Sequence, residues 1–172
     1  MSSSSQTHKK IRRLAYAGII AAAYVVLTWL SALVGLEGKG AIQLRISEAL
    51  CILPYFTPTA IAGLSLGCLL ANLFTAAALP DLIFGTLATL LGALGSYLLR
   101  RRKFLVPLPP ILANTLIIPV VIKTAYVGVE ESLPFLFLTV GIGEILSVGV
   151  LGTILLLALE RRRSRLFPDD IT

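Results

Sequence analysis

The sequence predicts an all-α integral membrane protein with six transmembrane helices and with both termini in the cytoplasm. Hydrophobic residues make up 56% of the chain and charged residues only 14%, and the mean hydropathy is +0.90, which does not describe a soluble domain. Twelve of the fifteen basic residues form three short clusters, within residues 9–13, 100–103 and 161–165. Because Lys and Arg beside membrane spans stay on the cytoplasmic side, the three clusters are expected on one face of the bilayer.

The spacing of these clusters sets the number of helices in a single domain of residues 1–172. Clusters on one face must be separated by an even number of crossings. Residues 14–99 have room for four spans of about 20 residues each, and residues 104–160 have room for two and a loop. The predicted helices cover residues 14–34, 42–57, 59–79, 81–99, 106–126 and 133–159.

The first two helices follow from the apolar runs near the N-terminus. Residues 1–10 are polar and are expected to form a disordered cytoplasmic tail. The run over residues 14–34 has no small-residue cleavage site at its end, which predicts an uncleaved span and not a signal peptide. An outside loop at residues 35–40 leads to the second helix, which is short and which Pro54 should kink.

Prolines set the boundaries of the later helices. Pro58 precedes the third helix, and Pro80 opens the fourth. Pro107, Pro109 and Pro110 break the entry to the fifth helix. An outside loop at residues 127–132 then leads to the sixth helix, and the residues from 167 onward are expected to form a soluble tail.

Several functional classes are disfavoured by what the sequence lacks. Basic clusters at span ends beside anionic lipid explain the net charge of +6, so no nucleic-acid partner is expected. The single histidine, His8, lies in the tail, and Cys51 and Cys68 fall in apolar segments without a metal-ligand pattern. A phosphate-binding loop is missing as well. We therefore expect no metal, no cofactor and no catalytic activity.

A few polar side chains lie within or beside the predicted spans, where ionisable groups are costly and usually mark a binding site or a conduction path. Most of them lie in the outer half of the membrane, which predicts a cavity open to the exterior above a closed apolar half. The candidate ligand-binding residues are Arg45, Glu48, Asn72, Asp81, Asn114 and Glu144.

Each candidate also has a purely structural interpretation. Arg45 and Glu48 could form an interfacial ion pair, Asp81 could cap a helix, and the two asparagines could bond neighbouring helices. Glu144 lies deepest in its helix, and two glycines leave room beside it. Its structural alternative is a buried ion pair with Arg45 or with Lys123.

Small residues on the first helix form a separate signal. Ala17 and Ala21, and Gly18 and Ala22, are pairs at a spacing of four, which lets a second helix approach closely. That second helix could belong to the same chain or to another membrane protein.

Five stretches between the second and the sixth helix form a recognisable pattern. They are residues 44–50 (LRISEAL), 53–58 (LPYFTP), 67–72 (GCLLAN), 81–90 (DLIFGTLATL) and 141–144 (GIGE). Together they resemble the QueT family. Its members are similar to the substrate-binding subunits, or S components, of energy-coupling-factor (ECF) transporters, with queuosine precursors or related 7-deazapurines as assigned substrates.

The resemblance implies a multi-pass protein of the bacterial plasma membrane that acts in vitamin-type uptake. Such a subunit has an outward-facing site capped by the loop after the first helix, here residues 35–40, and topples in the membrane to release its ligand inside. Two ATPase subunits supply the energy through a transmembrane scaffold subunit. An AxxxA motif contacts that scaffold, and Ala17 and Ala21 match it, with Gly18 and Ala22 extending the small face.

The chemistry of a 7-deazaguanine, such as 7-aminomethyl-7-deazaguanine or queuine, suits these residues. Its ring N–H and exocyclic amine form a donor pair that one carboxylate, Glu144 or Glu48, could accept. Its carbonyl needs a donor, and its aminomethyl cation needs a counter-charge such as Asp81. The candidate donors are Arg45, Asn72 and Asn114, and the candidates for stacking on the ring are Trp29, Tyr55 and Tyr126.

Other functions stay open at this point. The same fold could bind another vitamin, such as thiamine or pantothenate, since a cationic thiamine would also favour carboxylates. A structural or channel subunit is a different class, although a channel should carry polar residues through its full depth. A small membrane enzyme would need catalytic groups that the sequence does not present.

Overall fold

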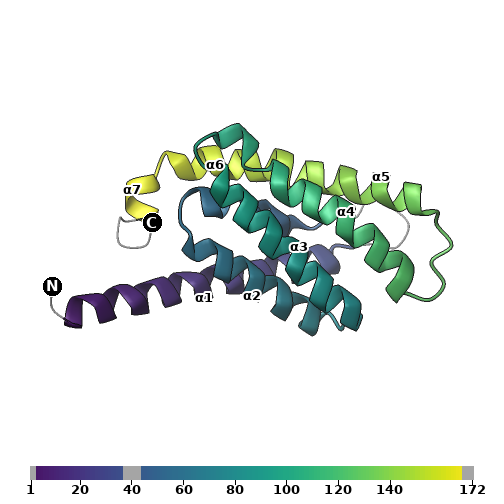
Figure 1. The fold of residues 1–172 in the computed structure, drawn as a ribbon, viewed down its shortest axis with the longest axis horizontal. Helices are drawn as coiled ribbons and strands as arrows, with labels where there is room; N and C mark the ends of the chain where they lie inside the picture. Colours follow the sequence, from purple (N-terminus) through teal and green to yellow (C-terminus); the bar gives the residue numbers. More distant parts are fainter. Residues whose placement is uncertain (1–2, 37–43, 168–172) are drawn as a thin grey trace.

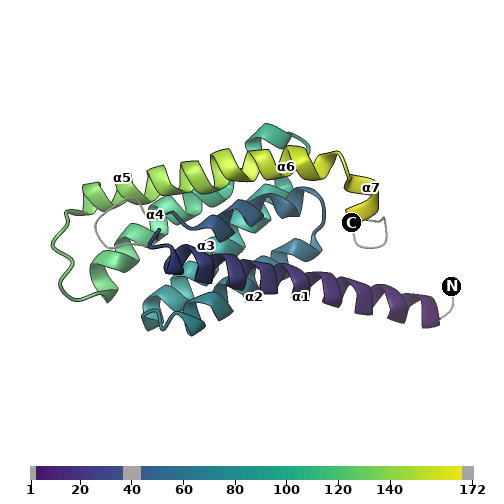
Figure 2. The ribbon, with the colours of Figure 1, turned by 180° about the vertical axis from the view of Figure 1, so that it is seen from behind.

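The computed structural model describes residues 3–36 and 44–167, and within these ranges the chain is helical, with no β-strand. The helices pack into a bundle that has the start of α1 and α7 at one end and the α4–α5 connection at the other (Figures 1 and 2). In chain order the elements are α1 (Ser3–Leu33), η1 (Ile46–Tyr55), α2 (Thr59–Phe74), α3 (Leu79–Leu98), η2 (Lys103–Leu105), α4 (Leu108–Ala125), α5 (Leu133–Glu144), η3 (Ile145–Gly152), α6 (Thr153–Glu160) and α7 (Arg163–Leu166).

Four helical segments are long and apolar enough to cross a membrane. They are Gln6–Leu33, Leu79–Leu98, Lys103–Ala125 and Leu133–Glu160. The apolar helices η1 and α2 are shorter. The composition and these four helices identify the chain as a membrane protein.

The first helix is longer than predicted. It begins at Ser3, so residues 3–10, expected to be a disordered tail, continue α1. This stretch contains no Gly or Pro, and extending an existing helix fixes only one residue at a time. Residues 37–43, which hold most of the predicted outside loop and the start of the second predicted helix, lie outside the described residues.

The second predicted helix is a 3-10 helix, η1, at the centre of the bundle. Ten residues at about 2.0 Å each give it a length of roughly 20 Å. Seven of its residues are buried, and it contacts α1, α3, η3 and α6. Because its neighbours cover it, a non-α backbone with Pro54 inside it is shielded from lipid, where unsatisfied backbone groups would be costly.

Two glycines bring α2 directly against α1. A Cβ atom on Gly63 would lie 2.8 Å from the carbonyl oxygen of Ala17, and one on Gly67 would lie 2.8 Å from the Cβ atom of Tyr24. Ordinary carbon–carbon contacts are about 3.5 to 4.0 Å, so any larger residue would push the helices apart. The close approach fixes the position of Tyr24, which is fully buried.

The helix α2 ends at Phe74, earlier than the predicted end at residue 79. Ala76 has a left-handed φ of 52°, and the amide of Ala77 donates to the carbonyl oxygen of Asn72. This is the Schellman pattern of helix ends, in which the left-handed residue is usually a glycine. An alanine carries no such signal, which is why the earlier end was not predicted.

Two prolines in the first turn of α4 form the surface on which α3 packs. A Cβ atom on Gly92 would lie 2.7 Å from the Cα atom of Pro110, and one on Gly95 would lie 2.4 Å from the Cβ atom of Pro109. The buried hydroxyl of Ser96 donates to the carbonyl oxygen of Val106 over 2.7 Å. These contacts hold the α3–α4 connection close to α3.

The last long helix consists of α5, η3 and α6, which follow one another without a break over Leu133–Glu160. Its middle part, η3, is a π-helix that begins directly after Glu144. Short π-helical segments within α-helices are frequent at functional sites. Beyond α7, Phe167 was expected to be in a soluble tail, but it stacks on Phe56 with ring centroids 4.7 Å apart.

Candidate ligand-binding pocket

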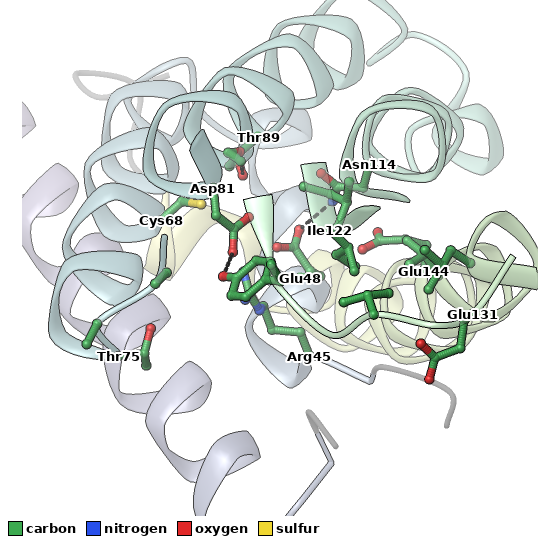
Figure 3. Close-up of a pocket in the computed structure, with 18 of the residues that line it drawn as sticks. Arg45, Glu48, Cys68, Thr75, Asp81, Thr89, Asn114, Ile122, Glu131 and Glu144 are labelled. Carbon is green, nitrogen blue, oxygen red and sulfur yellow. Dashed lines mark hydrogen bonds between the residues drawn. The ribbon is translucent and has the colours of Figure 1, made fainter. Parts of the chain in front are cut away.

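A cavity of about 370 Å³ lies at the end of the bundle away from α7, where the α2–α3 and α4–α5 connections meet. Its volume is within the range of small-molecule sites. Five of the six predicted ligand-binding residues line it (Figure 3): Arg45, Glu48, Asp81, Asn114 and Glu144. The sixth, Asn72, is fully buried beside the cavity, and its Oδ1 atom accepts a hydrogen bond from Arg45 Nη1 over 3.4 Å.

Glu48 accepts hydrogen bonds from three side chains. The hydroxyl of Tyr24 in α1 donates to its Oε1 atom. Its Oε2 atom accepts from Asn114 Nδ2 in α4 over 3.3 Å and from Cys51 Sγ over 3.1 Å. Glu48 is only 3% exposed, and it therefore joins α1, η1 and α4 at the deep end of the cavity.

A second group of polar side chains lies nearer the connections. The hydroxyl of Tyr126 donates to Asp81 Oδ2 over 2.9 Å, and Asn72 Nδ2 donates to the carbonyl oxygen of Asp81 over 3.3 Å. Asp81 lies in the first turn of α3, where the helix dipole favours a negative charge. The structural interpretation, in which Asp81 stabilises the start of α3, is therefore compatible with its position in the cavity wall.

Glu144 is a buried acid with one carboxylate oxygen that accepts no hydrogen bond from the described residues. It is 9% exposed, and its Oε2 atom has no hydrogen-bond partner among the described residues. Two further buried hydroxyl groups have no partner among the described residues. They belong to Thr115 on α4, which packs beside Gly141, and to Ser147, three residues after Glu144. Since buried polar atoms are nearly always hydrogen-bonded, a donor on a bound molecule or an ordered water would complete this region.

The connection between α4 and α5 forms part of the cavity wall, and the sequence did not predict this. Residues 127–129 and Glu131 line the cavity. Lys123 Nζ donates to the carbonyl oxygens of Val129 and Glu131 over 2.8 and 2.9 Å, and Gly128 allows the turn with a φ of +81°. Lys123, considered above as an ion-pair partner of Glu144, instead holds this part of the wall in place. The sequence held one sign of this: Glu131 is a charged residue in the loop between two predicted spans, on the outer side, where the cavity was expected.

Helical spacing could have found three further lining residues. Cys68 lies one turn before Asn72 on α2, and Thr89 lies two turns after Asp81 on α3, with Gly85 between them. All of these positions share a face with a predicted site residue. Cys68, Gly85 and Thr89 line the cavity.

Of the three predicted stacking residues, only Tyr126 lines the cavity. Trp29 is 58% exposed on the outer surface of α1. Tyr55 lies at the far end of η1, where its hydroxyl donates to Glu160 Oε1 over 3.0 Å, and Glu160 also pairs with Lys103 over 3.1 Å. Aromatic character alone did not indicate which way these side chains face.

The small residues of α1 divide between two faces. Ala21 is 3% exposed and lies against Gly67, and Ala17 lies against Gly63. Gly18 and Ala22 are exposed, and no atom lies within 4 Å of a Cβ placed on Gly18. In this structure the AxxxA pair is therefore used for packing within the chain, and the neighbouring pair is the one that faces outward.

The charges of the cavity wall are mostly negative. Arg45 is the basic residue among the lining residues, against four acids: Glu48, Asp81, Glu131 and Glu144. The chain as a whole carries +6, so the acids are concentrated here while the basic residues cluster elsewhere. Among the described residues, no three His, Cys, Asp or Glu side chains are arranged to hold a metal ion. The wall suits an organic molecule with hydrogen-bond donors or a positive charge.

The chain was compared with known families and proteins. A family model described as QueT transporter matches residues 14–161, which is most of the chain and includes every residue of the cavity wall. No curated protein and no solved structure matches the chain.

Proposed function

The chain belongs to the QueT transporter family, and we propose that it is the substrate-capture subunit of an ATP-driven ECF importer in the bacterial plasma membrane. Membership makes it a component of a membrane transporter and not an enzyme. In this role it binds one small molecule at its outer face and releases it inside after toppling in the bilayer.

The observation that carries this proposal is the cavity itself. In its wall, Glu144 has an oxygen atom without a hydrogen-bond partner in the described part of the chain. The wall is polar at one end of the bundle, and the core beyond it, around Ile52, Leu64 and Val148, is apolar and fully buried. A channel would need polar residues through its whole length. A pocket open at one end is what a capture subunit requires.

The proposed topology has six crossings with both termini in the cytoplasm. The four long apolar helices would make four of these crossings, and η1 and α2 would make the other two. Both are shorter than a bilayer core of about 30 Å, but they pack among the other helices. Lys103 and Glu160 form an ion pair, so the second and third basic clusters meet at one end, and α1 begins at that end as well (Figure 1). By the positive-inside rule this end is cytoplasmic, and the cavity then faces outward.

The proposed ligand is a 7-deazaguanine, such as 7-aminomethyl-7-deazaguanine or queuine. Its N–H and exocyclic amine would donate to Glu144, its carbonyl would accept from Arg45, and its ring would stack on Tyr126. The aminomethyl cation suits the surplus of acids in the wall, with Asp81 as counter-charge. The same surplus would favour another cationic molecule such as thiamine, which is the second candidate.

The proposed partners are a transmembrane scaffold subunit and two ATPase subunits. The scaffold would contact α1, and the exposed pair Gly18 and Ala22 offers the surface for it, since Ala17 and Ala21 lie against α2. Small residues on an exposed helix face let a second helix pack at close distance.

Calorimetric titration of the purified chain in detergent tests the ligand. Saturable binding of 7-aminomethyl-7-deazaguanine with a Kd near or below about 1 μM is expected, with little response to guanine, pantothenate or thiamine. Glu144→Gln should weaken binding by about 10- to 100-fold, because an amide N–H would face the ligand's donors. Glu160→Gln, at the opposite end of the bundle, is the matched control and should bind normally.

Other outcomes would change the proposal in defined ways. Binding of thiamine in place of the deazaguanine would keep the capture role and replace the ligand. Normal deazaguanine affinity in Glu144→Gln would exclude this residue from ligand contact. Silence of the folded chain toward all four compounds would contradict the capture role itself.

A further inference from the structure

We propose that Asn72 is a positioning residue: it holds the guanidinium of Arg45 in the cavity wall, and through Arg45 it selects a ligand whose ring carries a carbonyl group. This inference rests on the proposed function, in which Arg45 donates to the carbonyl of a 7-deazaguanine, and it deepens that function. Asn72 was predicted to touch the ligand itself; here it acts on the residue that does.

Asn72 is out of reach of a ligand in the cavity. Its side chain is fully buried, and it is not one of the residues that line the cavity. Its amide fits against α3 because residue 85 is a glycine, where a Cβ atom would lie 3.0 Å from Asn72 Nδ2, closer than ordinary non-bonded contacts. The amide is therefore enclosed between α2 and α3, and any effect that it has on binding must pass through a neighbour.

Both ends of the Asn72 amide have partners that fix its orientation. Its Nδ2 atom donates to the carbonyl oxygen of Asp81 over 3.3 Å and to Cys68 Sγ over 3.7 Å. Its Oδ1 atom accepts from Arg45 Nη1 over 3.4 Å. A backbone carbonyl can only accept and a guanidinium can only donate, so turning the amide over would break the bonds at both ends. The oxygen of Asn72 must therefore face Arg45.

The two helix ends that hold this amide are themselves fixed. The backbone carbonyl of Asn72 accepts from the amide of Ala77 over 3.0 Å, at the C-terminal end of α2. On the other side, Asp81 lies in the first turn of α3, and its carboxylate accepts from the hydroxyl of Tyr126 over 2.9 Å. The amide of Asn72 thus connects two fixed helix ends to Arg45.

Arg45 lies in an extended segment and not in a helix. Its backbone has a φ of −105° and a ψ of 106°, directly before η1. Its side chain lines the cavity and points toward Asp81 (Figure 3). An arginine side chain has many rotamers, and holding its planar fork in advance reduces the freedom lost when a ligand binds. The bond to Asn72 uses one of its five N–H groups and holds the fork on the α2 side of the cavity.

A guanidinium held in this way distinguishes the groups at one edge of a ring. A carbonyl oxygen at that edge accepts its N–H groups, whereas an amine in the same place would set donor against donor. A ligand without a good acceptor there leaves the charged donors unpaired, which costs more than it does for neutral groups. Asn72 thereby raises the selectivity for a carbonyl without touching it.

Two substitutions at position 72 separate this role from packing. Asn72→Asp keeps an oxygen for Arg45 and loses the donor to the carbonyl of Asp81. Asn72→Leu has a similar size and loses both. Because the two variants share the loss at Asp81, the difference between them reports the contact with Arg45. Asn72→Leu combined with Arg45→Gln completes a double-mutant cycle.

The probes are 7-aminomethyl-7-deazaguanine and its thioxo analogue, in which sulfur replaces the carbonyl oxygen while the ring N–H and the amine stay. Each is titrated by calorimetry into the purified full-length chain in detergent. Sulfur is a weak acceptor, so the wild-type chain should prefer the oxygen probe by about 10-fold. Asn72→Leu should bring this ratio to within about twofold of one, whereas Asn72→Asp should keep it within about threefold of wild type. Arg45→Gln should also abolish the preference, and adding Asn72→Leu to it should change the ratio by no more than about twofold.

The ratio of the two affinities is the decisive readout, because a merely structural role of Asn72 would weaken both probes equally. A full preference in Asn72→Leu would overturn the inference. So would a loss in Asn72→Asp as large as that in Asn72→Leu, since the cause would then be the bond to Asp81. A larger change on adding Asn72→Leu to Arg45→Gln would also overturn it, because Asn72 would then act without Arg45.

Gly85→Ala is a second test, in case thermal unfolding shows that Asn72→Leu does not fold. It keeps every polar group but presses a Cβ atom against Asn72 Nδ2, and it should lower the ratio by about two- to fivefold. An unchanged ratio there would overturn the inference as well. If the wild-type chain binds neither probe, the proposed function fails. If it binds both probes equally, the capture role stands and only this inference fails.

Discussion

The contact between α1 and α2 allows a quantitative prediction from a single added methyl group. In Gly67→Ala the new Cβ atom would lie 2.8 Å from the Cβ atom of Tyr24 and 3.0 Å from the Cα atom of Ala21. Carbon atoms in contact prefer about 3.5 to 4.0 Å, so α1 would have to move away by close to 1 Å. Because one of the two atoms is backbone, no rotamer change relieves the contact.

The size of the effect follows from two opposing terms. Overpacking of this kind costs about 1 to 3 kcal/mol, whereas replacing glycine by alanine within a helix gains about 1 kcal/mol. Gly18→Ala on α1 is the matched control, since nothing lies within 4 Å of its Cβ position and only the favourable term applies. The difference in unfolding free energy between the two variants should therefore be about 1 to 3 kcal/mol, with Gly67→Ala the less stable.

Unfolding by titration with a denaturing detergent in mixed micelles, followed by circular dichroism, measures this difference. Gly67→Ala should also weaken binding of the deazaguanine probe, because the shift of α1 moves Tyr24 relative to Glu48. Equal stability of Gly67→Ala and Gly18→Ala would refute the reasoning, since it would mean that the two helices separate without loss. The reasoning would also be refuted if Gly18→Ala lowered the unfolding free energy as much as Gly67→Ala, because no atom lies close to the Cβ position of Gly18.

Three further predictions concern other contacts. Ala22→Leu should leave the stability of the isolated chain unchanged and reduce its co-purification with the scaffold subunit, whereas Ala21→Leu should destabilise the chain itself by about 1 to 3 kcal/mol; the reverse pattern would assign the docking face to Ala21. Lys123→Met should raise the hydrogen-exchange rate of the α4–α5 connection and speed ligand dissociation by about three- to tenfold, because two bonds to that connection are lost; unchanged exchange would show that the connection is held by other contacts. Ser96→Ala should lower the unfolding free energy by about 1 to 2 kcal/mol by leaving the carbonyl of Val106 unpaired, and a neutral result would mean that water reaches this carbonyl.

The sequence predicted the polar residues of the cavity better than the shape of the helices that carry them. Charged and amide side chains are rare in apolar spans and costly there, so Arg45, Glu48, Asp81, Asn114 and Glu144 could be identified one by one, and all five line the cavity. The hydrogen bonds among them could not be predicted, because they depend on the distances between helices.

Helix boundaries and helix types were predicted less well, for physical reasons that differ between elements. The end of α2 depends on a left-handed alanine, a conformation that the residue type does not announce. The 3-10 form of η1 depends on the neighbours that cover it, since an apolar run with one proline is compatible with a kinked α-helix as well. The π-helix after Glu144 likewise leaves no mark on the apolar pattern.

The two small-residue pairs of α1 show what limits such predictions most. Neighbouring residues on an α-helix are turned by about 100°, so the pair Ala17 and Ala21 and the pair Gly18 and Ala22 face different neighbours although their spacing is the same. Spacing alone could not separate them. The two glycines of α2 do so in the structure, because they admit only the first pair at close distance and leave the second exposed. A docking motif read from one helix is thus incomplete until the partner helix within the same chain is known, and here that partner takes the alanine pair.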